Sequence, residues 1–161
     1  MKIKAIIEED YTNYKKPAMF IGTSSCSGKC CSEACLPLSV CQNDKWRSRS
    51  PFIIQDDEIC KRYLSNPITE AIVFGGLEPF EQTDELISFV RTFRFVHGCK
   101  DDVVIYTGYY ENEIAKEIET IRQFSNVILK VGRYVPGQES HYDDTLGVWL
   151  ASDNQKGIKI S

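Results

Sequence analysis

The sequence lacks a long apolar segment, because no run approaches the roughly 20 residues that a membrane-spanning helix needs. It also lacks an excess of positive charge: 23 acidic and 19 basic side chains give a formal net charge of −4. This balance argues against broad binding to nucleic acids or anionic membranes. The apolar stretch within the N-terminal MKIKAIIEEDY is too short for a signal peptide and turns acidic at once. We therefore expect a cytoplasmic protein with no nucleic-acid or membrane partner.

Histidine is also scarce, whereas cysteine is abundant. The two histidines, His97 and His141, lie far from the cysteines in the sequence, and we expect both at the surface. Five of the seven cysteines fall between Cys26 and Cys41. Cytosolic thiols stay reduced, and an odd number of cysteines cannot all pair. This group of thiols therefore favours a metal or redox role over a disulfide framework.

The length of 161 residues suits one domain, and we treat residues 1–161 as a single unit. Short apolar runs alternate with segments whose apolar residues have helical spacing, and such βα repeats predict an α/β fold with a mainly parallel sheet. About four parallel strands are too few for a closed eight-stranded barrel, so we expect a partial barrel or an open sheet. The expected strands are 2–7, 18–22, 71–74, 103–106, 127–131, 146–150 and 157–160, and the expected helices are 56–65, 83–93 and 111–124.

The thiol-rich loop follows the first all-apolar strand and reads CSGKCCSEACLPLSVCQN, starting at Cys26. Three residues separate Cys26 from Cys30, and Gly28 between them lets the backbone fold around a large ligand. Ten residues separate Cys30 from Cys41. This spacing suits an iron–sulfur cluster, whose thiolate ligands surround a cube. Structural zinc and unligated thiols remain open alternatives.

The other cysteines have simpler interpretations. Cys31 and Cys35, with three residues between them, form a rival pair of ligands. Cys60 lies on the apolar face of the helix expected at 56–65, together with Leu64, and is expected to be a small core residue. Cys99 is expected to be a loop thiol.

A second motif, GGLEP, follows the apolar strand expected at 71–74. Its glycines allow close approach of a ligand to the backbone, and Glu78 or the neighbouring carbonyls can hold a cationic amine. A tight turn ended by proline is the alternative. The thiol-rich loop, this motif and Thr107-Gly108 all follow parallel strands. Ligands of such sheets bind beyond the carboxyl ends of the strands, so three unusual loops at one rim favour a binding site.

Together these segments resemble the radical S-adenosylmethionine (SAM) enzymes, and among them the small activating proteins of anaerobic ribonucleotide reductase. The matching segments follow one another along most of the chain. They are the Cys-x-x-x-Cys loop with Cys41-Gln42-Asn43, a GGEP-like Gly75-Gly76-Leu77-Glu78-Pro79 with one residue inserted, Tyr106-Thr107-Gly108-Tyr109, and Ser152-Asp153-Asn154-Gln155.

The chain departs from the family pattern in two places. The family normally has a much shorter spacing between its second and third cysteines than the ten residues found here. The asparagine that trails Cys41 favours this residue over Cys35 as the third ligand. Gly132-Arg133-Tyr134 stands where the family usually has an Asp-Gly pair.

The resemblance implies that Cys26, Cys30 and Cys41 bind three irons of a 4Fe-4S cluster, with the fourth iron open to the amine and carboxylate of SAM. An electron from the cluster then breaks the sulfonium S–C5′ bond, and the resulting 5′-deoxyadenosyl radical abstracts a hydrogen atom. The resemblance requires no catalytic side-chain acid or base. The residues that it implies for cofactor binding are Gly75, Gly76, Leu77, Glu78, Pro79, Tyr106 and Asn154.

The same resemblance implies a glycyl-radical enzyme as partner, the large subunit of an anaerobic ribonucleotide reductase, and a low-potential electron donor such as flavodoxin. With so few strands the barrel has an open side, which suits a macromolecular substrate better than an enclosed small molecule. Two alternatives are a radical SAM enzyme that modifies a small molecule or peptide, and a non-enzymatic α/β binding module stapled by zinc.

Overall fold

The computed structural model describes residues 1–161 and contains a seven-stranded sheet of order β3-β1-β2-β4-β5-β6-β9. Almost every residue of its central strands is buried, because both faces of the sheet are covered, and this explains why the strands are apolar throughout. The predicted α/β fold with an open, mainly parallel sheet is confirmed. The parallel strands are β2 (Ala18–Thr23), β4 (Ala71–Gly75), β5 (Asp102–Tyr106) and β6 (Val127–Val131).

Antiparallel strands complete the two edges of the sheet. At one edge, β1 (Lys2–Asp10) pairs with β2, and the short β3 (Phe52–Ile53) pairs with β1. At the other edge, β9 (Lys156–Lys159) pairs with β6. A separate hairpin consists of β7 (His141–Asp143) and β8 (Val148–Leu150). The strands expected at 2–7 and 157–160 are therefore present as β1 and β9, each antiparallel to its parallel neighbour, whereas the strand expected at 146–150 is present only as β8 of the separate hairpin.

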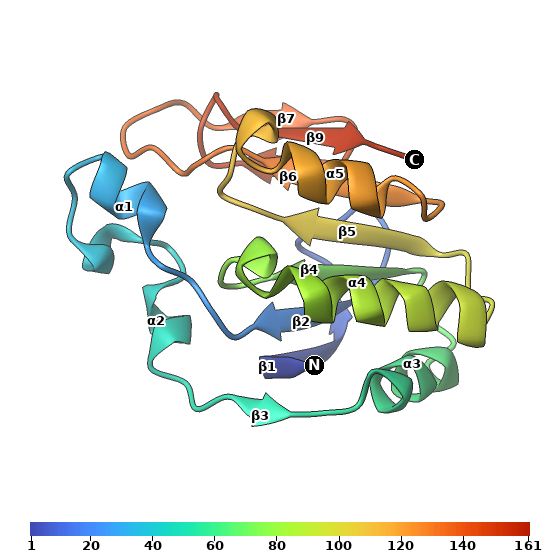
Figure 1. The fold of residues 1–161 in the computed structure, drawn as a ribbon. Helices are drawn as coiled ribbons and strands as arrows, with labels where there is room; N and C mark the ends of the chain where they lie inside the picture. The colour runs from blue at the N-terminus through green and yellow to red at the C-terminus, as the bar shows by residue number, and fades with distance from the viewer.

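Three helices contribute to the larger core on one face of the sheet. They are α3 (Asp56–Ser65), α4 (Thr83–Arg91) and α5 (Ala115–Ile121). Figure 1 shows α4 and α5 in front of the strands with α3 at the lower right. Cys60 of α3 is fully buried in the larger core, as predicted. The inward orientation expected for Leu64 is wrong, since this side chain is 49% exposed at the edge of the buried stripe. No helix of the chain has both the length and the apolar character needed to span a membrane.

The third predicted helix is shorter in the structure than in the prediction for 111–124. A 3-10 turn (Glu111–Glu113) precedes it, and Ile114 then interrupts the helical backbone with φ −123° and ψ 27°. Only Ala115–Ile121 is α-helical. The apolar spacing was correct for the buried side chains, among them Ile118 and Ile121, but could not show this interruption.

The opposite face of the sheet carries a second, smaller core. Because successive side chains of a strand point to opposite faces, Phe20, Val73, Val104 and Ile128 turn away from the helices. Trp46 and the hairpin residue Leu150 pack against this face. The thiol-rich loop lies beyond the carboxyl ends of the parallel strands (Figure 1). It holds α1 (Lys29–Glu33) and leads into α2 (Asp44–Arg47), so two short helices interrupt the expected loop and connection.

Candidate metal and cofactor site

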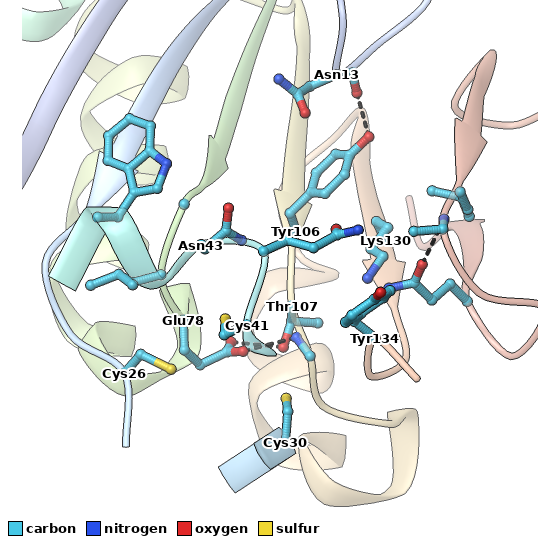
Figure 2. Close-up of a pocket in the computed structure, with 18 of the residues that line it drawn as sticks. Asn13, Cys26, Cys30, Cys41, Asn43, Glu78, Tyr106, Thr107, Lys130 and Tyr134 are labelled. Carbon is cyan, nitrogen blue, oxygen red and sulfur yellow. Dashed lines mark hydrogen bonds between the residues drawn. The ribbon is translucent and has the colours of Figure 1, made fainter. Parts of the chain in front are cut away.

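A cavity of about 420 Å³ lies between the thiol-rich loop and the second core. This volume falls within the range typical of small-molecule sites. Four thiols line it, those of Cys26, Cys30, Cys31 and Cys41. Figure 2 shows the sulfur atoms of Cys26 and Cys30 pointing toward the space beside Glu78. The loop that follows β2 therefore forms one wall of a cavity at the carboxyl end of the sheet, where ligands of such sheets bind.

All seven cysteines are free thiols, and the structure sorts them into distinct groups. Cys35 is exposed and does not line the cavity, whereas Cys31 is buried and does. The rival pair of Cys31 and Cys35 therefore does not share one site. Cys60 lies in the core and Cys99 is half-buried outside the cavity.

Burial disfavours the charged form of two of the cavity thiols, those of Cys26 and Cys30. Burial raises the pKa of Cys26, although the nearby Arg47 guanidinium opposes this effect. Burial also raises the pKa of Cys30 to about 11, against the opposing charge of Arg133. Because thiolates are the form that binds metal, a metal centre bound here would have to displace these protons.

The wall opposite α1 is shaped by glycine. A Cβ atom at Gly108 would lie only 2.6 Å from Cys30 Sγ, so the space that this sulfur occupies exists because residue 108 has no side chain. On the other side of the loop, a Cβ atom at Gly22 would lie 2.6 Å from Trp46 Cζ3. Trp46 thus packs directly on the end of β2, and its ring lies 5.8 Å from that of Phe20. These contacts hold the loop close to the strand ends.

Glu78 joins the second and third loops of the rim. Its buried carboxylate accepts hydrogen bonds from Thr107 Oγ1 (2.7 Å), Gly108 N (2.9 Å) and Phe80 N (3.2 Å). Burial raises the pKa of Glu78, while these hydrogen bonds favour the ionised form. The Glu78 N–H in turn donates to Ser25 O at 2.8 Å, directly before the first thiol. All three unusual loops predicted for this rim are therefore linked through one residue.

Lys130 is a buried cation in the same cavity, and the sequence interpretation missed it. Its side chain points to the cavity face of β6, and it is only 8% exposed. The ammonium group donates to Gly132 O at 2.9 Å, and burial lowers its pKa to about 8. Lys130 is the one charged residue in the otherwise apolar strand VILKV, and this position could have marked it as a candidate site residue.

The structure brings most of the predicted site residues together. Tyr106 lines the cavity, and its hydroxyl donates to Asn13 O at 2.5 Å (Figure 2). The predicted residues on the cavity wall are Cys26, Cys30, Cys41, Gly76, Leu77, Glu78 and Tyr106.

Three predicted residues do not line the cavity. Gly75 ends β4, where its carbonyl accepts a hydrogen bond from Thr23, and Pro79 begins a 3-10 turn. Asn154 donates to Arg133 O and Tyr110 OH, each at 3.0 Å, and its buried Oδ1 has no hydrogen-bond partner. Their assignment to cofactor binding stays a prediction.

The donor set of the cavity fits an iron–sulfur cluster. Three of the four lining thiols, those of Cys26, Cys30 and Cys41, come from separate points of one loop, as a cubane with one thiolate on each of three irons requires. The structure has no group of three or more His, Cys, Asp or Glu side chains placed to hold a single metal ion.

Comparison with known proteins agrees with this donor set. The family model described as a 4Fe-4S single cluster domain matches residues 20–158, which include the thiol-rich loop, the GGLEP segment and all four parallel strands apart from the first two residues of β2. No curated protein and no solved structure matches the chain. Because the matched region covers most of the sequence, the chain belongs to this family of radical SAM domains, whose cofactors are a 4Fe-4S cluster and SAM.

Proposed function

We propose that this protein cleaves SAM reductively and thereby installs a glycyl radical on a partner enzyme, an anaerobic ribonucleotide reductase. The observation that carries the proposal is the shared cavity. Cys26, Cys30 and Cys41 line it together with Gly76 and Glu78 of the GGLEP segment. A ligand that contacts the thiol-bound metal therefore also reaches this segment.

Each part of the site has a role that its chemistry supports. In this proposal the thiolates of Cys26, Cys30 and Cys41 hold the cluster. The backbone at Gly76 and Leu77 can approach a ligand closely, and Glu78 adds negative charge for a cationic amine. If bound, the cluster would supply one electron to SAM, and cleavage of the sulfonium carbon–sulfur bond would yield methionine and a 5′-deoxyadenosyl radical. This radical would become 5′-deoxyadenosine by taking a hydrogen atom from the substrate. The protein binds, orients and shields its cofactors, and no side-chain acid or base is required.

The surface around the cavity supports a macromolecular substrate. Trp149 of β8 lines the cavity and is nevertheless 70% exposed, and its ring packs edge-on against Tyr142 of β7 at 6.0 Å. Exposed aromatic side chains at the rim of a site are typical anchors of protein–protein contacts. A loop of the reductase that carries the target glycine is the occupant we propose, with a low-potential protein such as flavodoxin as electron donor.

A second candidate function is modification of a small anionic molecule or peptide. Lys130 favours it, because its buried ammonium faces the cavity and forms no ion pair with a carboxylate of the protein. An anionic group of a ligand would offset the cost of burying this charge. The two candidates share SAM cleavage and differ only in what receives the radical.

Anaerobic reconstitution with iron and sulfide tests both the cleavage of SAM and the transfer of the radical to a partner enzyme. We expect a brown protein that forms 5′-deoxyadenosine from SAM when reduced with dithionite. Addition of an anaerobic ribonucleotide reductase large subunit should then give the EPR doublet of a glycyl radical. SAM cleavage without this doublet would contradict the partner, and a modified small molecule formed without any partner would favour the second candidate. A colourless protein that binds one zinc would contradict the function as a whole.

A further inference from the structure

The charged side chain of Arg47 donates a hydrogen bond to one thiol of the cavity, that of Cys26. One guanidinium nitrogen donates to Cys26 O at 2.8 Å, and the other donates to Cys26 Sγ at 3.3 Å. The side chain is 21% exposed. A Cβ atom at Gly28 would lie 3.4 Å from the same terminal nitrogen, so the guanidinium fits closely into the bend of the loop.

The charge of Arg47 is not taken up by a close carboxylate. The nearest one, Asp44, lies 3.7 Å away and is 46% exposed, and Arg47 Nε has no hydrogen-bond partner. Arg133, on the other side of the loop, differs in this respect. Its guanidinium forms contacts of 2.6 and 2.7 Å with the two carboxylate oxygens of Glu113. The charge of Arg47 therefore acts on the cavity thiols, and on Cys26 through a direct hydrogen bond, whereas that of Arg133 is largely neutralised.

We propose that Arg47 is a positioning residue that holds Cys26 and raises the reduction potential of the cluster bound through it. The inference rests on the proposed function, because it requires a cluster at Cys26, Cys30 and Cys41. Reduction of the cluster adds one electron from an external reductant, such as dithionite, and neither forms nor breaks a bond. The added negative charge lies partly on the ligand sulfurs, so a charged donor at Cys26 Sγ stabilises the reduced form more than the oxidised form.

The experiment is an EPR-monitored redox titration of the reconstituted full-length protein, without SAM and without a partner. We expect Arg47→Gln to make reduction about tenfold less favourable, which corresponds to a midpoint about 59 mV more negative for a one-electron couple. Arg47→Lys retains the charge but cannot contact both Cys26 atoms at once, so we expect a shift in the same direction of roughly threefold. The matched control is Arg49→Gln, since Arg49 lies over the Trp46 ring and contacts no thiol. Its midpoint should equal that of the wild type.

The outcomes separate this inference from the function on which it rests. A wild type that assembles no cluster contradicts the proposed function itself. Wild-type midpoints in both Arg47 variants, or an equal shift in Arg49→Gln, overturn the role of Arg47. If Arg47→Gln does not retain iron, Arg47→Lys decides the matter alone. Loss of the cluster from both variants, with retention in Arg49→Gln, would make Arg47 necessary for cluster retention and would likewise overturn the proposed tuning.

Discussion

The two halves of the thiol-rich loop are held in very different ways. The anchored half, residues 26–33, contains Cys26 and Cys30 and is tied to distant parts of the chain by side-chain hydrogen bonds and ion pairs. The local half, residues 34–41, ends at Cys41 and has only hydrogen bonds within its own neighbourhood. Two of the proposed ligands, Cys26 and Cys30, thus lie in a segment that distant residues hold in place. The third, Cys41, lies in a segment held only by hydrogen bonds of its own turns.

Three carboxylate contacts secure the anchored half. Ser27 N–H donates to Glu81 at 2.6 Å. Lys29, at the start of α1, pairs with Glu113 at 2.6 Å, and Glu33, at its end, pairs with Arg133 at 2.7 Å. Arg133 also pairs with Glu113, so one ion network joins both ends of α1 to the opposite rim. The proposed ligand Cys30 is carried by this helix and is therefore placed before any metal binds.

The local half lacks such ties. Its bonds are short-range, such as Leu36 N to Cys31 O at 2.9 Å and Cys41 N to Leu38 O at 2.9 Å. No side chain of residues 34–41 forms an ion pair or a hydrogen bond with a residue outside the loop. Cys35 has a positive φ of 53°, which is an uncommon conformation for a residue with a side chain. Metal binding at Cys41 would therefore supply the long-range constraint that the chain itself does not provide.

The largest effect is expected from removal of the ligands themselves. Cys30→Ala and Cys41→Ala should each abolish the cluster and SAM cleavage, although they lie in different halves. Cys35→Ala should retain both, because Cys35 is exposed and outside the cavity. Iron content and 5′-deoxyadenosine formation measure the outcome. Retention of the cluster in Cys41→Ala together with its loss in Cys35→Ala would show that Cys35, and not Cys41, is the third ligand. The comparison between the two proposed ligand positions would then no longer hold.

Disruption of the ion network should have the next largest effect. Arg133→Gln leaves Glu113 without its buried guanidinium partner, so the free energy of unfolding of the apo-protein should fall by about 2 kcal/mol. This lies below the range for fully buried pairs, because Glu113 and Glu33 retain access to solvent. Arg122→Gln is the control: its pair with Glu119 is exposed and longer, 3.4 Å, and should cost less than about 0.5 kcal/mol. Equal values from urea titrations of the two variants would show that the network anchors nothing.

Hydrogen exchange should separate the two halves directly in the wild type. Amides of the local half should exchange roughly tenfold faster than those of α1 in the apo-protein, relative to their intrinsic rates, because local opening there breaks few long-range contacts. Cluster loading should reduce this difference, since Cys41 becomes fixed to the same centre as Cys30. Equal protection in the apo-protein would refute the distinction, and an unchanged difference after loading would argue against Cys41 as a ligand.

The sequence predicted the strands and the loops of the site, but not the contacts that distinguish the two halves of the thiol-rich loop. Apolar runs located the parallel strands, and motif spacing located the loops at their carboxyl ends, because both depend on residues close in the chain. The spacing of cysteines, however, could not show that Cys31 faces the cavity and Cys35 does not. Arg133 stood out only as a departure from a family pattern, and its partner Glu113 is 20 residues away in the sequence. Contacts between separate elements depend on packing, which local patterns do not encode.

The smallest effect concerns pH and should act on the anchored half alone. Hydrogen bonding to Arg133 is the main reason that the pKa of Glu113 lies well below its ordinary value of 4.5, with Lys29 adding to the effect. The unfolded chain therefore binds a proton more readily, so the contribution of Glu113 to stability is complete above the ordinary carboxyl range and is lost as pH falls below it. Glu113 is partly exposed, which keeps the change small.

We expect exchange in α1 to accelerate between pH 5 and pH 3, after correction for intrinsic rates, while the local half shows no comparable change. In Glu113→Gln, which has no titrating group at this position, the acid-dependent difference should disappear. Acceleration of equal size in both halves would show that acid loosens the whole loop. The network of Arg133 and Glu113 would then not be what distinguishes the position of Cys30 from that of Cys41.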